Sequence, residues 1–76
     1  MTIDKAKEIA NNNISWHIDD INKLVKSSLK ELTEAQDSYS GYFHIMEQVI
    51  GEYKFHCSRI SEAKLQLQIV EALEKG

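Results

Sequence analysis

The stretch Asp37-Ser38-Tyr39-Ser40-Gly41 lies near the middle of a 76-residue chain. All five residues are mediocre or poor helix formers, and together they cost a helix about 3 kcal/mol relative to alanine. Asp and Ser side chains compete for backbone hydrogen bonds and favour turns and N-caps, while glycine adopts a left-handed conformation at little cost. We therefore expect a turn over 37–41 that joins two helices of matched length, over 14–36 and 42–74.

A seven-residue apolar repeat runs through both predicted helices. Alternating steps of four and three residues from Ile14 to Val70 land mostly on apolar side chains, and Ser28 and His56 are the clearly polar exceptions. This period is typical of helices that pack at a shallow angle, as in coiled coils and bundles. We expect the larger members of the repeat to form the protein interface: Ile18, Ile21, Val25, Leu32, Met46, Val49, Tyr53, Ile60, Leu67 and Val70.

The apolar band is wider than the repeat itself. A two-stranded coiled coil carries charges beside its seam, whereas a band that extends beyond the seam suits a helix with two neighbours, as in a four-helix bundle. We therefore predict an all-α fold, an antiparallel helical hairpin with heptad packing that dimerises into a four-helix bundle. One alternative is a continuous coiled coil, because the heptad phase runs unbroken through 37–41. The apolar residues that flank the seam are Leu24, Leu29, Phe43, Ile45, Ile50, Cys57 and Leu73.

The segment before Ile14 does not continue the repeat. Three successive asparagines, Asn11 to Asn13, separate it from the first long helix, and asparagine favours caps over helix interiors. We expect residues 2–10 to form a separate short helix or an arm. A three-helix monomer that uses this segment is the second alternative fold.

Size and composition predict one small helical domain over residues 1–76. A chain this short buries about 60% of its unfolded surface, so it usually needs a staple such as a disulfide, a metal or a partner chain. Cys57 is the single cysteine, which excludes an intrachain disulfide. The lone cysteine, the absence of a signal peptide and the absence of a membrane-length apolar run predict a cytoplasmic protein that does not bind membranes.

Two short-range pairs are the candidate metal ligands. His17 and Asp20 are spaced i, i+3, and Glu52 and His56 are spaced i, i+4, so each pair shares a helix face. Each pair supplies two ligands, whereas a structural zinc ion takes four, and the sequence therefore predicts no metal and no cofactor. We expect His56 to lie at the edge of the core with a hydrogen-bond partner such as Glu52.

The sequence predicts no enzyme. His56 and Cys57 are adjacent, so their side chains diverge by about 100° on a helix and form no catalytic dyad. The chain carries neither a glycine-rich phosphate loop nor a nucleophile elbow.

Two groups of residues off the repeat are candidate binding surfaces. One is a partner patch of apolar side chains, Trp16, Phe55, Leu65 and Ile69. The other is a stripe of candidate nucleic-acid contacts, Lys23, Lys26 and Lys30, on one face of the first helix. The net charge of −3 and the acidic neighbours of these lysines weaken any attraction for phosphates.

The sequence thus predicts a small, non-enzymatic protein–protein interaction module, such as an adaptor, an inhibitor or a small chaperone. Its first partner is itself, as a homodimer, and its second is an unidentified protein. An RNA- or DNA-binding hairpin dimer that uses the lysine stripe is the alternative.

Overall fold

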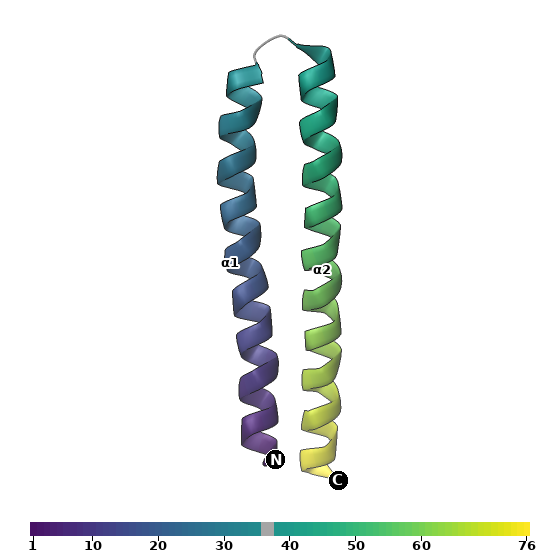
Figure 1. Ribbon diagram of the computed structural model, residues 1–76. Helices are drawn as coiled ribbons and strands as arrows, with labels where there is room; N and C mark the ends of the chain where they lie inside the picture. The colour runs from purple at the N-terminus through teal and green to yellow at the C-terminus, as the bar shows by residue number, and fades with distance from the viewer. Residues whose placement is uncertain (36–37) are drawn as a thin grey trace.

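The computed structural model describes residues 1–35 and 38–76, which form an antiparallel hairpin of two long helices (Figure 1). Helix α1 spans Ile3–Ala35 and helix α2 spans Tyr39–Lys75. The rod measures 57 × 15 × 15 Å, and both chain ends lie at the end opposite the turn. The predicted all-α hairpin is confirmed. The alternatives of one continuous helix and of a three-helix monomer are wrong.

Helix α1 begins earlier than the repeat predicted. The Thr2 hydroxyl oxygen accepts a hydrogen bond from the Lys5 backbone N–H at 3.1 Å, which caps the first turn. Residues 3–10 are therefore the first turns of α1 rather than a separate short helix or arm. The asparagines do not break the helix, because Ala10 before them is buried and Asn13, the last of them, is half-buried toward α2, and tertiary packing overrides a weak propensity.

Ser38 decides where α2 begins. Its backbone is extended, and its side-chain oxygen accepts a hydrogen bond from the Gly41 backbone N–H at 3.1 Å. Tyr39, Ser40 and Gly41 therefore form the first turn of α2 instead of the turn predicted over 37–41. Asp37, the first residue of that predicted turn, lies outside the described residues.

The seam between the helices is most deeply buried at small side chains. Within the described ranges, the fully buried hydrophobic residues are Ala10 and Ala63, at 2% and 3% exposure. Ser28 is the buried polar residue of the seam, and its hydroxyl donates to the Leu24 carbonyl at 2.6 Å. The larger seam residues are half-buried: Ile14, His17, Ile21, Leu24 and Leu32 of α1, and Met46, Val49, His56, Ile60, Leu67 and Val70 of α2.

Three residues of the predicted interface do not lie in this seam. Ile18, Val25 and Tyr53 are 46%, 55% and 48% exposed. The α1 side chains that pack in the seam at these levels are His17 and Leu24. Each precedes by one residue the apolar side chain that the repeat favoured, Ile18 or Val25. A band broader than one neighbouring helix leaves one edge uncovered, and the pairing of the two helices decides which edge that is.

The open end of the hairpin is joined by an ion pair between Lys7 and Glu74. Hydrogen bonding to the Glu74 carboxylate raises the pKa of the Lys7 ammonium above its usual value. Neither α1 nor α2, over the residues described, has an apolar stretch that could cross a membrane.

Candidate functional site

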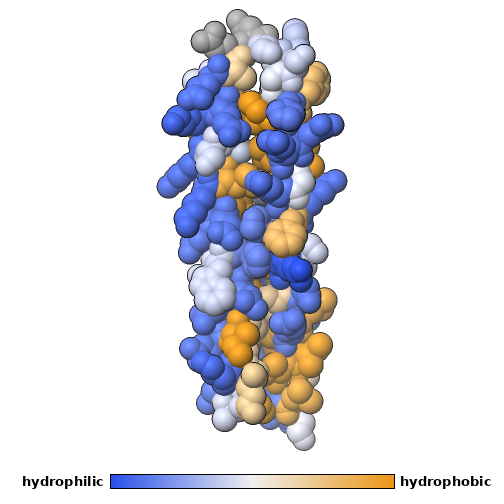
Figure 2. Space-filling model, viewed as in Figure 1, coloured by the Kyte–Doolittle hydropathy of each residue, from blue (hydrophilic) through white to orange (hydrophobic). Residues whose placement is uncertain are grey.

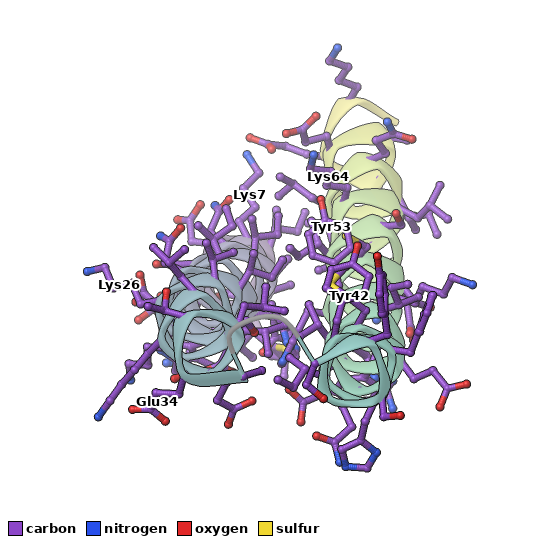
Figure 3. All side chains as sticks on the ribbon, turned by 90° about the horizontal axis from the view of Figure 1, so that it is seen from above. Lys7, Lys26, Glu34, Tyr42, Tyr53 and Lys64 are labelled. Carbon is purple, nitrogen blue, oxygen red and sulfur yellow. The ribbon has the colours of Figure 1, made fainter. Side chains whose placement is uncertain are left out.

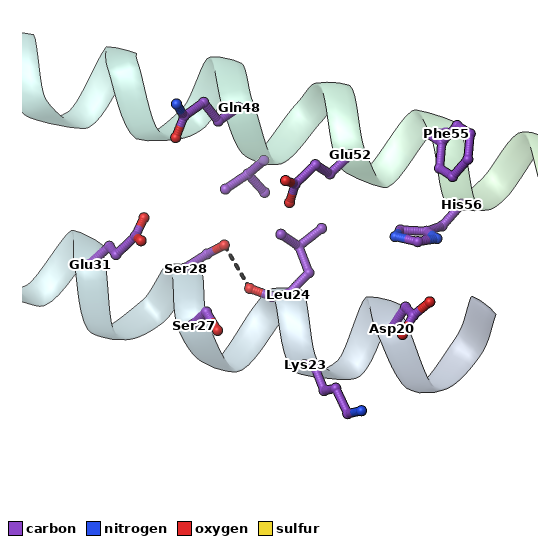
Figure 4. A pocket seen from close by; sticks show the side chains of 11 residues that line it. Asp20, Lys23, Leu24, Ser27, Ser28, Glu31, Gln48, Glu52, Phe55 and His56 are labelled. Carbon is purple, nitrogen blue, oxygen red and sulfur yellow. Dashed lines mark hydrogen bonds between the residues drawn. The ribbon is translucent and has the colours of Figure 1, made fainter. Parts of the chain in front are cut away.

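One side of the seam is a polar groove of about 530 Å³. Figure 4 shows its charged side chains, with Asp20, Lys23 and Glu31 on α1 and Glu52 on α2. On the side of the hairpin seen in Figure 2, hydrophilic atoms border the seam over most of the half nearer the turn. The lining of the polar groove is completed by Leu24, Ser27, Ser28, Gln48, Val49, Phe55 and His56.

The opposite side of the seam is apolar. In α1, Asp20 and Ser27 border the groove, so Ile18 and Val25, on the other flank of the seam, face away from it. In α2, Glu52 borders the groove, and Ile50 lies on the flank that faces away. The two flanks therefore lie on one side of the hairpin, which we call the apolar face. Its exposed residues are Ile18, Val25 and Leu29 of α1 and Tyr42, Phe43, Ile50 and Tyr53 of α2, and half-buried Leu32 and Cys57 border them at the seam.

The aromatic residues of the apolar face are visible from the turn end of the rod. In Figure 3, Tyr42 and Tyr53 lie on one side of the hairpin and Glu34 lies on the other. The Tyr42 and Phe43 rings meet edge-on, with centroids 5.4 Å apart. Hydrogen bonding with the Cys57 side chain raises the pKa of the Tyr53 hydroxyl. The apolar face thus carries aromatic and aliphatic groups, and Lys64 lies on the same side of the hairpin, farther along α2 (Figure 3).

A cluster of possible ligands lies at one end of the polar groove. The Nδ1 atoms of His17 and His56 are 2.9 Å apart, within hydrogen-bond distance. Ligand atoms of His17, Asp20 and His56 all lie within 4.8 Å of one another. The partner of His56 is thus His17 of the other helix, not the expected Glu52. Phe55 packs edge-on against both imidazoles, with ring centroids 6.2 Å from His17 and 5.3 Å from His56.

The four residues of the predicted partner patch are all exposed, but they are spread along the rod. Phe55 lies at the level of His17, which its ring contacts, and Arg59 lies 5.4 Å from the centre of the same ring. Ile69 follows Phe55 by four helical turns, which places it about 21 Å farther along α2. Trp16 belongs to α1 and Leu65 to the C-terminal part of α2. They do not form one compact surface.

The lysine stripe follows the outer side of α1. Lys26 points away from α2 (Figure 3). Lys23 borders the polar groove together with Asp20, Glu31 and Glu52. These three carboxylates oppose the approach of a phosphate to Lys23, so the geometry adds no support for a nucleic-acid site.

Comparisons of the chain with protein-family profiles, with curated proteins and with solved structures find no match.

Proposed function

We propose that this chain is a non-enzymatic protein–protein interaction module, and that its first partner is a second copy of itself. The observation that carries the proposal is the apolar face, which spans both helices on the side opposite the polar groove. Two copies that join through this face form a four-helix bundle, in which each helix packs against a helix of its own hairpin and another of the partner hairpin.

The solvent-exposed area of the single hairpin supports the proposal that a partner covers part of its surface. The single hairpin exposes 6010 Å², whereas a compact monomer of 8.7 kDa exposes about 4,700 Å². The surplus of roughly 1,300 Å² exceeds the ~800 Å² that each partner buries in a standard protein interface. Because the buried hydrophobic residues of the described chain are two alanines, the hairpin also lacks the core that would stabilise it alone.

The chemistry of the apolar face suits a second copy. A two-fold interface requires one surface to be complementary to itself, and a surface made mostly of apolar side chains satisfies this with few like charges brought together. Asp20, Lys23, Glu31 and Glu52 lie across the seam, in the polar groove. An apolar helix of another protein can bind the same face in place of the second copy. Binding of this kind is how an adaptor, an inhibitor or a small chaperone would act.

The test replaces Val25 and Ile50 together by glutamate. These side chains lie on the apolar face, one on each helix, and four carboxylates would be brought together in the dimer. We expect the double variant to lose the concentration dependence of its melting temperature and much of its helicity at micromolar concentration, as measured by circular dichroism.

The matched control places two glutamates on the outer sides of the same helices, as Thr33→Glu and Ser58→Glu. Both of these positions are exposed. This control should keep the wild-type melting behaviour. Equal melting curves for the Val25/Ile50 variant and the wild type at every concentration would contradict the proposal.

A further inference from the structure

We propose that His17, Asp20 and His56 form a site for a divalent transition-metal ion of the zinc class, which links the two helices. The two ligand pairs that the sequence offers separately meet here, because the antiparallel pairing places His17 opposite His56. Asp20 lies one turn after His17 on the same face of α1, so α1 supplies two ligands and α2 supplies at least one.

The distances suit a shared ion. Zinc binds imidazole nitrogen at 2.0–2.1 Å, so two nitrogens of a tetrahedral site lie about 3.3 Å apart. The two Nδ1 atoms are 2.9 Å apart, and the three ligand atoms lie within 4.8 Å of one another. Small rotations of exposed Asp20 and of the half-buried imidazoles bring all three onto one ion. The imidazole that donates the present hydrogen bond then carries its proton on Nε2 and offers Nδ1 to the metal.

The groove supplies the rest of the coordination shell. Glu52 lies one turn before His56 and extends into the gap between the helices (Figure 4). Its carboxylate can become a fourth ligand by a change of rotamer, and water from the open groove can occupy the position otherwise. Two imidazoles with carboxylates favour Zn²⁺, Co²⁺, Ni²⁺ or Cu²⁺ over Mg²⁺ and Ca²⁺, which prefer oxygen ligands alone.

Such an ion would cross-link the two helices and stabilise the hairpin. The chain has a single cysteine and a core of small side chains, and small domains of this kind often use a metal to hold their elements together. His17 is on α1 and His56 on α2, so an ion bound by both resists separation of the helices. The site lies on the polar-groove side, so it does not depend on the apolar face or on self-association.

The experiment compares thermal unfolding of the purified protein in EDTA, in Zn²⁺ and in Mg²⁺. We expect Zn²⁺ at roughly 100 times its dissociation constant to raise the melting temperature by at least about 5 °C, and Mg²⁺ to leave it unchanged. His17→Ala and His56→Ala should each abolish the Zn²⁺ response. His44→Ala removes the third histidine, which is exposed on α2 and outside the cluster, and should keep the full response.

A second measurement covers the case in which a histidine variant fails to fold. Co²⁺ titration followed by visible absorption is performed on Asp20→Asn, whose exposed side chain can be changed without loss of packing. We expect its Co²⁺ affinity to fall at least ~10-fold relative to wild type and to His44→Ala. A wild-type protein with no response to millimolar Zn²⁺ would overturn the assignment. An equal response in the cluster variants and in His44→Ala would do the same.

Discussion

Ala10 and Ala63 are the most deeply buried apolar side chains between the two helices in the described part of the chain. Both are almost fully buried, whereas every larger apolar residue in the described seam is partly exposed. A small side chain at the contact lets helix backbones come together, and little space remains for added methylene groups. The described seam is therefore most deeply buried at small side chains and has no large side chain that is fully buried.

Replacing Ala63 by leucine should therefore destabilise the protein. The added atoms must push the helices apart or adopt a strained rotamer, and we expect a loss of about 1–3 kcal/mol in the free energy of unfolding. Urea denaturation measures the loss. Ala72→Leu on the exposed side of the same helix is the control and should change stability by less than ~0.5 kcal/mol. A stabilised Ala63→Leu variant would show that the seam contains unfilled space.

The histidine pair shows what residue-level reasoning on the sequence can and cannot find. The spacings reveal that His17 accompanies Asp20 and that Glu52 accompanies His56, since neighbours on one helix depend on helical geometry alone. The contact between His17 and His56 depends on how α2 is paired with α1. Which residues face each other across the seam depends on where α1 ends and α2 begins. The turn predicted over 37–41 differs from the observed start of α2 at Tyr39, so it does not give this pairing.

At the scale of the helices, the N-cap of α2 is the local interaction that fixes where this helix begins. The Ser38 side-chain oxygen accepts the Gly41 backbone N–H, and the Ser38 carbonyl accepts the Tyr42 N–H. We predict that Ser38→Ala lowers the free energy of unfolding by about 1 kcal/mol, because the Gly41 N–H loses its partner. Ser58→Ala, on an exposed outer position of α2, serves as the control. An unchanged stability in Ser38→Ala would mean that water replaces the cap without cost.

The two internal glycines of α2 are expected to respond differently to replacement by alanine. A Cβ atom at Gly51 would meet nothing within 4 Å, so Gly51→Ala should stabilise the protein by about 0.5–1 kcal/mol through helix propensity. A Cβ atom at Gly41 would lie 3.3 Å from both the Ala35 Cβ and the Ser38 Oγ. Gly41→Ala should therefore gain less than Gly51→Ala or lose stability. Thermal unfolding of the two variants compares them, and a larger gain at Gly41 would contradict the close contact with α1.

The existence of both helices followed from the sequence, but their ends did not. Poor helix formers at 37–41 predict the reversal near the middle of the chain, and the hairpin confirms it. Their number does not reveal which one becomes the cap, so the sequence predicts a turn that includes Tyr39 to Gly41. Asn11 to Asn13 have similarly weak propensities, yet packing of Ala10 and Asn13 toward α2 keeps them helical, and single-helix propensity contains no information about that packing.

For the whole molecule, the width of the apolar band was the informative property of the sequence. It predicted more apolar surface than one neighbouring helix can cover, and the structure leaves the apolar face open on one side of the hairpin. The pattern does not reveal which edge of the band is covered, so it predicts Ile18 and Val25 in the protein interface without separating the hairpin seam from a contact between two copies. Their exposure now places them at the centre of the proposed interface between two copies.

Sedimentation equilibrium over concentrations from micromolar to millimolar tests the central claim, self-association through the apolar face, most directly. We predict a mass approaching twice 8.7 kDa at the higher concentrations, and a loss of helicity as the dimer dissociates on dilution. A fully helical protein with a mass of 8.7 kDa at every concentration would contradict the claim, because the hairpin would then be stable with its apolar face exposed to water.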